Sequence, residues 1–265
     1  MRHNSPKISS IEKALDVLTE FARSGREMGT VELSQSLGFH VATVSRMLQI
    51  LRQKGFIQHN EKTRKFSLGT SSFELGRAVF RLLQGNLLKI AMPYLVDLCE
   101  QIGETVVLET MSGDDLIVGY IAQGRNSLTV APKIGDKLPF HVSPGGKSIL
   151  AFSDPTVVDT LLPKELEALT PNTITDRAAL ARCLEEVRKQ GFAFSQQEML
   201  LGVHTVGAPV FDHDNRPIAA VVIVGLVSRI PLDPGSTLLA ALMKTARDIS
   251  AQLFHQDGLE PGRLP

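Results

Sequence analysis

A single glycine between two short amphipathic segments places the strongest constraint on how this chain can fold. The apolar spacing predicts one helix over residues 30–37, with Thr30 as its cap, and another over about residues 40–54. Gly38 lies between them and can adopt the left-handed conformation that a tight interhelical turn requires. The pattern predicts a helix-turn-helix, whose second helix can enter the major groove of DNA, although any two packed helices would share it.

An earlier helix and a following hairpin complete the predicted N-terminal unit. Ser9 and Glu12 have the spacing of a capping box, and the helix that they begin is expected to end at Gly25. Residues 55–59 and 65–68 alternate in hydrophobicity like two short strands, and the tip of the hairpin between them is basic. A basic hairpin after the second helix of the pair indicates a winged helix-turn-helix.

The positive charge of the chain is concentrated in this N-terminal part. Lys and Arg balance Asp and Glu at 28 each over the 265 residues. Residues 1–70 nevertheless hold eleven basic and six acidic side chains, whereas residues 71–265 hold seventeen and twenty-two. A local surplus of this kind suits double-stranded DNA as a partner.

Polar residues of the helix at 40–54 have the chemistry for reading DNA. Arg46 carries donors that pair with guanine, Gln49 can pair with adenine, and Thr43 and Ser45 can contact phosphates or bases. The wing cations are expected to bind the phosphate backbone and to make binding salt-dependent. Each of these side chains would also suit a solvated face. The predicted DNA-binding residues are Thr30, His40, Ala42, Thr43, Ser45, Arg46, Gln49, Arg52, Lys62, Arg64 and Lys65.

Composition and patterning exclude several other classes of protein. Hydrophobic residues make up 43% of the chain and charged residues 21%, which is typical of a globular protein, and the length allows two domains. The longest apolar stretch, residues 218–227, is too short to cross a bilayer. Residues 1–6 lack the apolar stretch of a secretory signal. We therefore expect a cytoplasmic protein without a membrane partner.

No catalytic, metal or cofactor site is predicted. Cys99 and Cys183 lie in helical patterns, so a disulfide is not expected. The seven histidines are scattered without metal-ligand spacing, and residues 212–215 have the composition of a hairpin turn. Neither a nucleophile elbow nor a pair of catalytic carboxylates is present as a motif, so we expect no enzyme activity.

The rest of the chain alternates between strand and helix patterns. Residues 72–90 predict a helix too apolar for a free surface, and Pro93 is expected in the first turn of the next helix, residues 93–101. Strands are predicted at 105–111, 115–121, 128–132, 192–196, 204–211 and 218–224, and helices at 145–152, 176–190 and 236–254. Helices that flank a mixed or antiparallel sheet predict an α+β sensor domain.

The segment 143–148 invites a nucleotide-binding interpretation. Residues 146–148 match the end of a phosphate-binding loop, but that motif needs a glycine five positions earlier, where this chain has His141. The remaining prediction is a glycine-containing turn that opens a helix and presents free amides to an anion such as a carboxylate. A helix start with glycine for close packing explains the segment equally well.

The order of these parts is similar to that of the isocitrate-lyase-regulator (IclR) family of bacterial transcription factors. The resemblance spans nearly the whole chain. Its N-terminal motifs are residues 10–15, 32–34, Gly38, 43–48 and 54–57, and its C-terminal motifs are residues 103–106, 138–141, 146–148, 208–212 and 218–221. A departure occurs at residues 40–42, His-Val-Ala, where members often have Pro and a polar residue.

The resemblance implies an α+β protein with a winged helix-turn-helix over residues 1–70, a linker and dimerisation helix over 71–90, a GAF-like effector-binding domain over 91–255, and a tail. It also implies a homodimer or a dimer of dimers. We therefore expect a ligand-responsive regulator that binds a palindromic operator. The alternative is a small-molecule-binding or hydrolytic domain whose helix-turn-helix mediates protein contacts.

The resemblance also implies where a small-molecule effector would bind. Members that sense small polar acids carry acidic, thiol or hydroxyl groups at several pocket positions. This chain has Val222 and Val224 at two of them, and Ser195 where an acidic residue is common. A drier pocket favours an aromatic or otherwise hydrophobic carboxylic acid, although these valines would also suit an ordinary core. The implied effector-binding residues are Leu138, Pro144, Gly145, Ser195, Thr205, Val222 and Val224.

Overall fold

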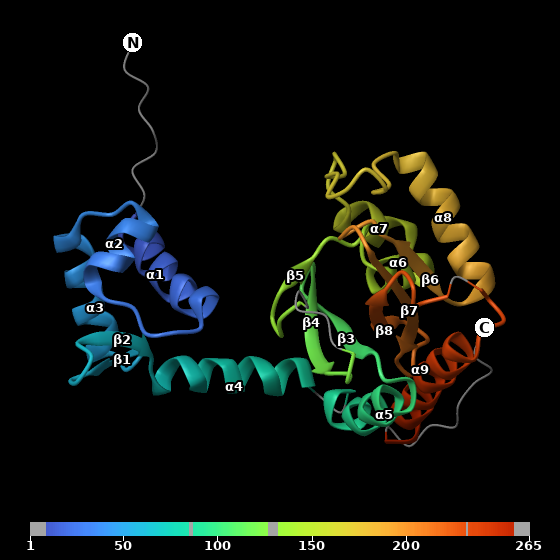
Figure 1. The fold of residues 1–265 in the computed structure, drawn as a ribbon, viewed down its shortest axis with the longest axis horizontal. Coiled ribbons are helices and arrows are strands. Elements are labelled where there is room, and N and C mark those ends of the chain that lie inside the picture. The colour runs from blue at the N-terminus through green and yellow to red at the C-terminus, as the bar shows by residue number, and fades with distance from the viewer. Residues whose placement is uncertain (1–8, 85–86, 127–131, 232, 257–265) are drawn as a thin grey trace, which may run out of the picture. The chain divides into compact units, whose positions relative to one another are not determined.

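The computed structural model describes residues 9–84, 87–126, 132–231 and 233–256 of the chain (Figure 1). Its contacts divide the chain into two compact units, Met1–Leu82 and Leu83–Pro265. Each unit has its own apolar core.

The first unit contains the three predicted helices. They are α1 (Ser10–Ser24), α2 (Thr30–Leu37) and α3 (Val41–Gln53). The capping box is confirmed, because the Ser9 hydroxyl accepts from the Glu12 amide and the Glu12 carboxylate accepts from the Ser9 amide. Gly38 has a φ of 67° and ends α2, as the sequence predicts. The core that joins these helices is built from buried apolar residues, including Val17, Phe21, Leu33, Val44, Met47, Leu48 and Leu51.

The prediction of Thr30 as a helix cap is wrong by one residue. Gly29 caps α2, and Thr30 is the first helical residue. The Glu32 carboxylate accepts a hydrogen bond from the Gly29 amide at 3.3 Å, which fixes the helix start one position earlier.

The predicted hairpin is present as β1 (Ile57–Asn60) and β2 (Lys65–Leu68), paired antiparallel. The first strand begins two residues later than expected, because Gly55 takes a left-handed φ of 74° in the preceding turn. A carboxylate outside the hairpin holds its tip: Glu27 accepts from Asn60 Nδ2 at 2.8 Å and from Thr63 Oγ1 at 2.7 Å. The wing is therefore anchored to the helical core.

The helix predicted over residues 72–90 is instead two helices, α4 (Thr70–Gln84) and α5 (Leu87–Ile102). Pro93 lies inside α5, so its prediction in a first helical turn is wrong. The buried face of α5 runs through this position, with Ile90, Ala91 and Leu95 in the core. Packing of that face offsets the hydrogen bond that proline removes.

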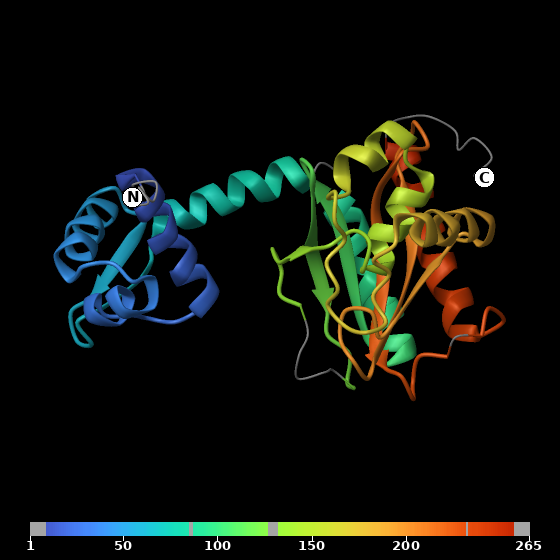
Figure 2. The same ribbon diagram turned by 90° about the horizontal axis from the view of Figure 1, so that it is seen from above.

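The second unit is built on a six-stranded antiparallel sheet in the order β5-β4-β3-β8-β7-β6 (Figures 1 and 2). The strands are β3 (Thr105–Ser112), β4 (Asp115–Ala122), β5 (Lys137–Leu138), β6 (Ala193–Gln196), β7 (Val203–Phe211) and β8 (Pro217–Leu226). The α+β class and the antiparallel sheet follow the prediction. The strand predicted at 128–132 lies almost wholly outside the described residues, and β5 was not predicted.

Helices cover both faces of this sheet. α5 and α9 (Thr237–Gln256) pack on one face, and α6 (Pro144–Phe152) and α8 (Arg177–Gln190) lie on the other side. The structure adds α7 (Pro155–Leu161), which the sequence analysis missed although Asp154 caps it and Pro155 opens it. The predicted turn at residues 212–215 is confirmed and joins β7 to β8, with Asn215 at a φ of 58°.

Candidate DNA-binding surface and effector-binding face

One face of α3 is free for a partner. Val44 and Leu48 are buried against the other helices, whereas Ala42, Arg46 and Gln49 lie on the exposed side. This division follows from the helical spacing of the apolar residues. Among the other predicted residues of this helix, Ser45 is exposed and Thr43 is half-buried. His40 caps α3 without a side-chain hydrogen bond, so its exposed imidazole has no capping role.

Several predicted DNA-binding cations already have an acidic neighbour. Glu61 lies 3.7 Å from both Arg52 and Arg64, and Lys65 lies 4.0 Å from Glu32. These pairs are exposed and long, so each contributes little stability and its cation can turn to a phosphate instead. Within the described residues, Arg46 and Lys62 make no ion pair.

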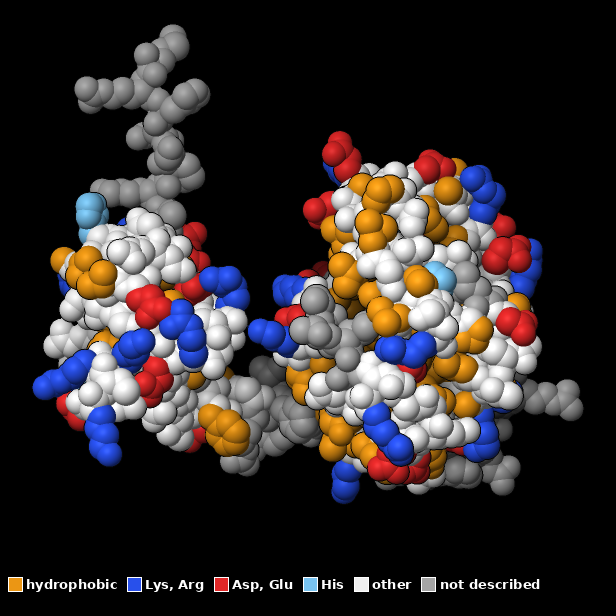
Figure 3. All heavy atoms as spheres, in the orientation of Figure 1, with side chains coloured by type: hydrophobic (Ala, Val, Ile, Leu, Met, Phe, Trp, Pro, Cys, Tyr) orange, Lys and Arg blue, Asp and Glu red, His pale blue; other side chains and the backbone are white. Residues whose placement is uncertain are grey.

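Basic side chains are also visible on the surface of the first unit. In Figure 3, several Lys and Arg side chains lie on the lower half of the visible face of the first unit, with acidic side chains among them. Thr30, in contrast, lies half-buried in the first turn of α2. The structure thus groups the α3 residues on one helix face and the wing cations on one hairpin.

The predicted effector-binding residues of the strands share one face of the sheet. Ser195 is paired with Thr205, which is paired in turn with Val224. Val222 lies on the same side of β8, two residues from Val224. The neighbouring cluster is apolar and is made of Val107, Val118, Ala220, Val222 and Val224, with Leu138 at its side.

The N-terminus of α6 packs directly on this face. The Ser143 hydroxyl caps the helix by accepting from the Gly145 amide at 3.2 Å, and Pro144 is the first helical residue. A Cβ on Gly207 would lie 2.9 Å from the Pro144 carbonyl carbon, and a Cβ on Gly145 would collide with Glu109 and approach Val222 at 3.1 Å. The glycines at this contact are therefore needed for close packing of the helix on the sheet.

A buried carboxyl group occupies the anion-binding end of α6. Glu109 of β3 is only 4% exposed, accepts a hydrogen bond from the Ser143 hydroxyl, and is hydrogen-bonded by the Gly146 amide. Burial raises the pKa of Glu109 to about 7, although these two hydrogen bonds act in the opposite direction. The helix start that the sequence predicts as free for a ligand anion is thus already filled by the chain itself.

A second buried charge lies one turn further along α6. Lys147 is fully buried, and its Nζ lies 2.5 Å from Glu198 Oε1 and 3.0 Å from the Phe194 carbonyl oxygen. Lys147 thus ties α6 to β6 and to the loop that follows it. The residue that completes a phosphate-binding motif in sequence is here one half of an internal ion pair.

Comparison with known proteins decides the family. Residues 10–61 match the IclR helix-turn-helix domain family, and residues 80–251 match the family described as bacterial transcriptional regulator IclR C-terminal. The chain belongs to the IclR family. The transcriptional repressor IclR of Escherichia coli (strain K12) is 32% identical over 248 residues, which cover 92% of this chain and 89% of that protein. The family resemblance noted in the sequence is confirmed.

Solved structures of IclR proteins have the same fold. The crystal structure of Thermotoga maritima IclR aligns with a TM-score of 0.78 and 29% identity, covering 92% of this chain and 98% of that one. An IclR homologue from Microbacterium hydrocarbonoxydans, solved in complex with 4-hydroxybenzoate, aligns with a TM-score of 0.77 over 93% and 100% of the two chains. Its 20% identity supports the fold alone.

These relatives determine the general function of this IclR-family chain. The Escherichia coli relative is a transcriptional repressor, and so by name is the acetate operon repressor of Salmonella typhimurium, which is 31% identical over 92% of this chain and 89% of that protein. The chain is accordingly a DNA-binding transcriptional regulator with a C-terminal ligand-binding domain, and not an enzyme.

The sequence analysis missed three buried charged residues next to the predicted effector-binding positions, namely Glu109, Lys147 and Glu198. Glu109 and Lys147 are each a single ionisable residue in a largely apolar stretch, and that contrast was the available signal, whereas Glu198 lies in a polar stretch that gave none. Over the described ranges, no cluster of His, Cys, Asp and Glu could hold a metal ion. No helix in the same ranges is long and apolar enough to cross a bilayer.

Proposed function

We propose that this chain binds a palindromic operator as a homodimer or a dimer of dimers, and that an organic acid in its second unit controls this binding. The DNA-binding part of this proposal rests on the exposed face of α3, where Arg46 and Gln49 lie opposite the buried Val44 and Leu48. Arg46 would read a guanine and Gln49 an adenine. Lys62, Arg64 and Lys65 of the wing would hold phosphates.

An apolar groove in the first unit supports a dimer. α1, α3 and α4 line an open groove of about 990 Å³, whose walls include Ile11, Leu15 and Leu75. These three side chains are each more than half exposed. Apolar surface of this extent is typical of a protein interface, and we assign the part formed by α1 and α4 to a second copy of the chain. The α3 residues that also line the groove, Ala42, Thr43 and Arg46, are left to the DNA. Two copies would place their α3 helices roughly 34 Å apart or a multiple of that distance on a palindromic site.

A gel-shift titration with the DNA upstream of the chain's own gene tests this function. Arg46→Ala should lower affinity by about 1–3 kcal/mol for the preferred sequence and relax its base preference. Neutralising the three wing cations should weaken binding to all sequences and reduce the salt slope by about one for each phosphate that is no longer neutralised. Arg182→Ala, an exposed arginine on α8, is the matched control. Binding without salt dependence or sequence preference would contradict the proposal.

The chemistry of the effector face supports a hydrophobic carboxylic acid. Val222 and Val224 provide an apolar wall, and Ser195 and Thr205 provide hydroxyl groups on the neighbouring strands. Because Glu109 fills the end of α6, the ligand carboxylate would bind either at these hydroxyls or beside a protonated Glu109. That one protein of this fold was solved with 4-hydroxybenzoate agrees with the proposed class.

A thermal-shift panel tests the effector class. Aromatic acids should raise the melting temperature of the second unit, and short polar acids such as glyoxylate should have little effect. Val222→Ser is the informative variant, because it should shift the preference toward polar acids. Stabilisation by short polar acids alone would contradict the proposal.

A further inference from the structure

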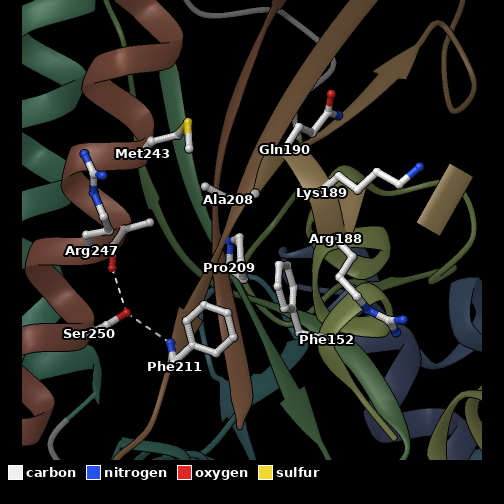
Figure 4. Close-up of a pocket in the computed structure, with 12 residues that line it drawn as sticks. Phe152, Arg188, Lys189, Gln190, Ala208, Pro209, Phe211, Met243, Arg247 and Ser250 are labelled. Atoms are coloured by element: carbon white, nitrogen blue, oxygen red, sulfur yellow. Dashed lines mark hydrogen bonds between the residues drawn. The ribbon is translucent and has the colours of Figure 1, made fainter. Parts of the chain in front are cut away.

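A small cavity lies at the edge of the sheet in the second unit. β6 pairs with residues 204–207 of β7, so within the described part of the chain the remainder of β7, up to Phe211, has no strand on that side. The cavity occupies this position, between α9 and the C-terminal end of α8, and has a volume of about 190 Å³ (Figure 4). None of the proposed effector-binding residues lines it.

The interior of this edge cavity is apolar. The rings of Phe152 and Phe211 meet edge to face, with centroids 5.2 Å apart, and Met243 of α9 lies across from them (Figure 4). The wall's Ser250 hydroxyl is already satisfied, since it donates to the Ala246 carbonyl at 2.8 Å and accepts from the Phe211 amide at 3.0 Å. A cavity of about 150 Å³ can hold a benzene molecule, so this cavity has room for one aromatic ring.

Every charged residue that lines the cavity is positive. Arg188 and Lys189 lie in the last turn of α8, where they also complement the helix dipole. Arg247 lies within α9, far from a helix end, and makes no ion pair among the described residues. Figure 4 shows Arg247 on one side of the ring pair and the other two cations on the opposite side, with their charged ends turned outward. Lys189 Nζ is paired with Glu186 at 2.8 Å, and Arg188 Nε donates to the Ala151 carbonyl oxygen at 2.6 Å. The exposed side chain of Arg247 is long enough to turn toward an anion without giving up such an interaction.

We infer that the edge cavity binds a small organic anion, namely an aromatic ring that carries one carboxylate. The ring would pack against Phe152 and Phe211, and the carboxylate would lie toward Arg247. Aromatic edge-to-face contact and a methionine sulfur both favour a ring in this position. The site does not depend on the proposed effector, because its walls belong to other residues.

Titration of the full chain with benzoate, observed through ¹³C-labelled methionine methyl groups, tests this inference. The Met243 resonance, assigned with Met243→Leu, should shift saturably with benzoate and much less with the neutral analogue benzyl alcohol. Arg247→Gln should raise the Kd for benzoate about fivefold by removing one exposed charge interaction. Arg182→Gln, a change of another exposed arginine on α8 that does not line the cavity, should leave the Kd unchanged.

The same titration can overturn the inference in three ways. An unshifted Met243 at about 10 mM benzoate would mean that the cavity does not bind the probe. An equal response to benzyl alcohol would remove the requirement for an anion. An equal Kd in Arg247→Gln would remove the role of Arg247. Because Met243 reports locally, failure of the proposed effector face would not change these readings.

Discussion

Glu109 is a carboxyl group without a cation, held on the face where a ligand is proposed to bind. Its pKa of about 7 lies above the ordinary pKa of a glutamate, 4.5, so folding takes up a proton at pH values between these two. A group whose pKa is raised on folding contributes full stability below its unfolded pKa, and that contribution is lost as the pH rises through the folded pKa. The chain should therefore lose stability between about pH 4.5 and 7, by about 3 kcal/mol.

Glu109→Gln should remove this pH dependence. The amide keeps the shape of the side chain and its oxygen can still accept from Ser143, but it carries no charge that burial would penalise. Chemical denaturation at about pH 5 and about pH 8 measures the difference, and Glu165→Gln, an exposed change, serves as the control. If the variant and the wild type lose equal stability over this range, Glu109 does not titrate as described.

In the buried Lys147–Glu198 ion pair, each charge should depend on the other for its contribution to stability. Lys147→Met leaves the buried Glu198 carboxylate without a cation and should cost about 3–5 kcal/mol. Lys147→Met combined with Glu198→Gln should recover much of this stability, because no unpaired charge remains. A double-mutant cycle of unfolding free energies measures the coupling. Additive effects would show that the two groups do not depend on each other.

At the scale of elements, the predictions succeeded where a local signal and the tertiary packing agree. α1 has a capping box and α2 ends at a left-handed glycine, so both helices were located from the sequence. Pro93 misled the prediction because its local effect is outweighed by the buried face of α5, which only the fold reveals. Of the candidate effector face, the valines of β8 followed from alternation, but the position of Glu109 at α6 depends on a long-range contact.

The packing of α6 on the sheet can be tested with two glycine substitutions of opposite expected sign. Gly145→Ala should cost about 1–3 kcal/mol, because the new methyl group would meet Glu109 and Val222. Gly76→Ala in α4 meets nothing within 4 Å and should stabilise by about 0.5–1 kcal/mol through helix propensity. Calorimetric unfolding of both variants makes the comparison. A neutral Gly145→Ala would mean that α6 can move away from the sheet without cost.

At the scale of the whole molecule, the two units must act together for a ligand to control DNA binding. Linkage requires that an acid which changes operator affinity by some factor has its own affinity changed by the same factor when the operator is bound. Two sites in separate units can be coupled in this way only through the chain between them or through an assembly of copies. The apolar groove of the first unit is the feature that favours an assembly.

Leu75→Glu tests that assembly and its effect on the operator together. Leu75 is 57% exposed and lines the groove, so a charge there should oppose a second copy without disturbing the fold of one chain. Sedimentation should show a smaller particle, and operator affinity should fall about 100-fold, because two half-sites would no longer be bound by linked domains. Leu169→Glu, at a 39% exposed position in the second unit, should change neither quantity. If Leu75→Glu kept both the wild-type mass and the wild-type affinity, the groove would not be the surface that joins the copies, and the spacing of the α3 helices on DNA would have to be set by another interface.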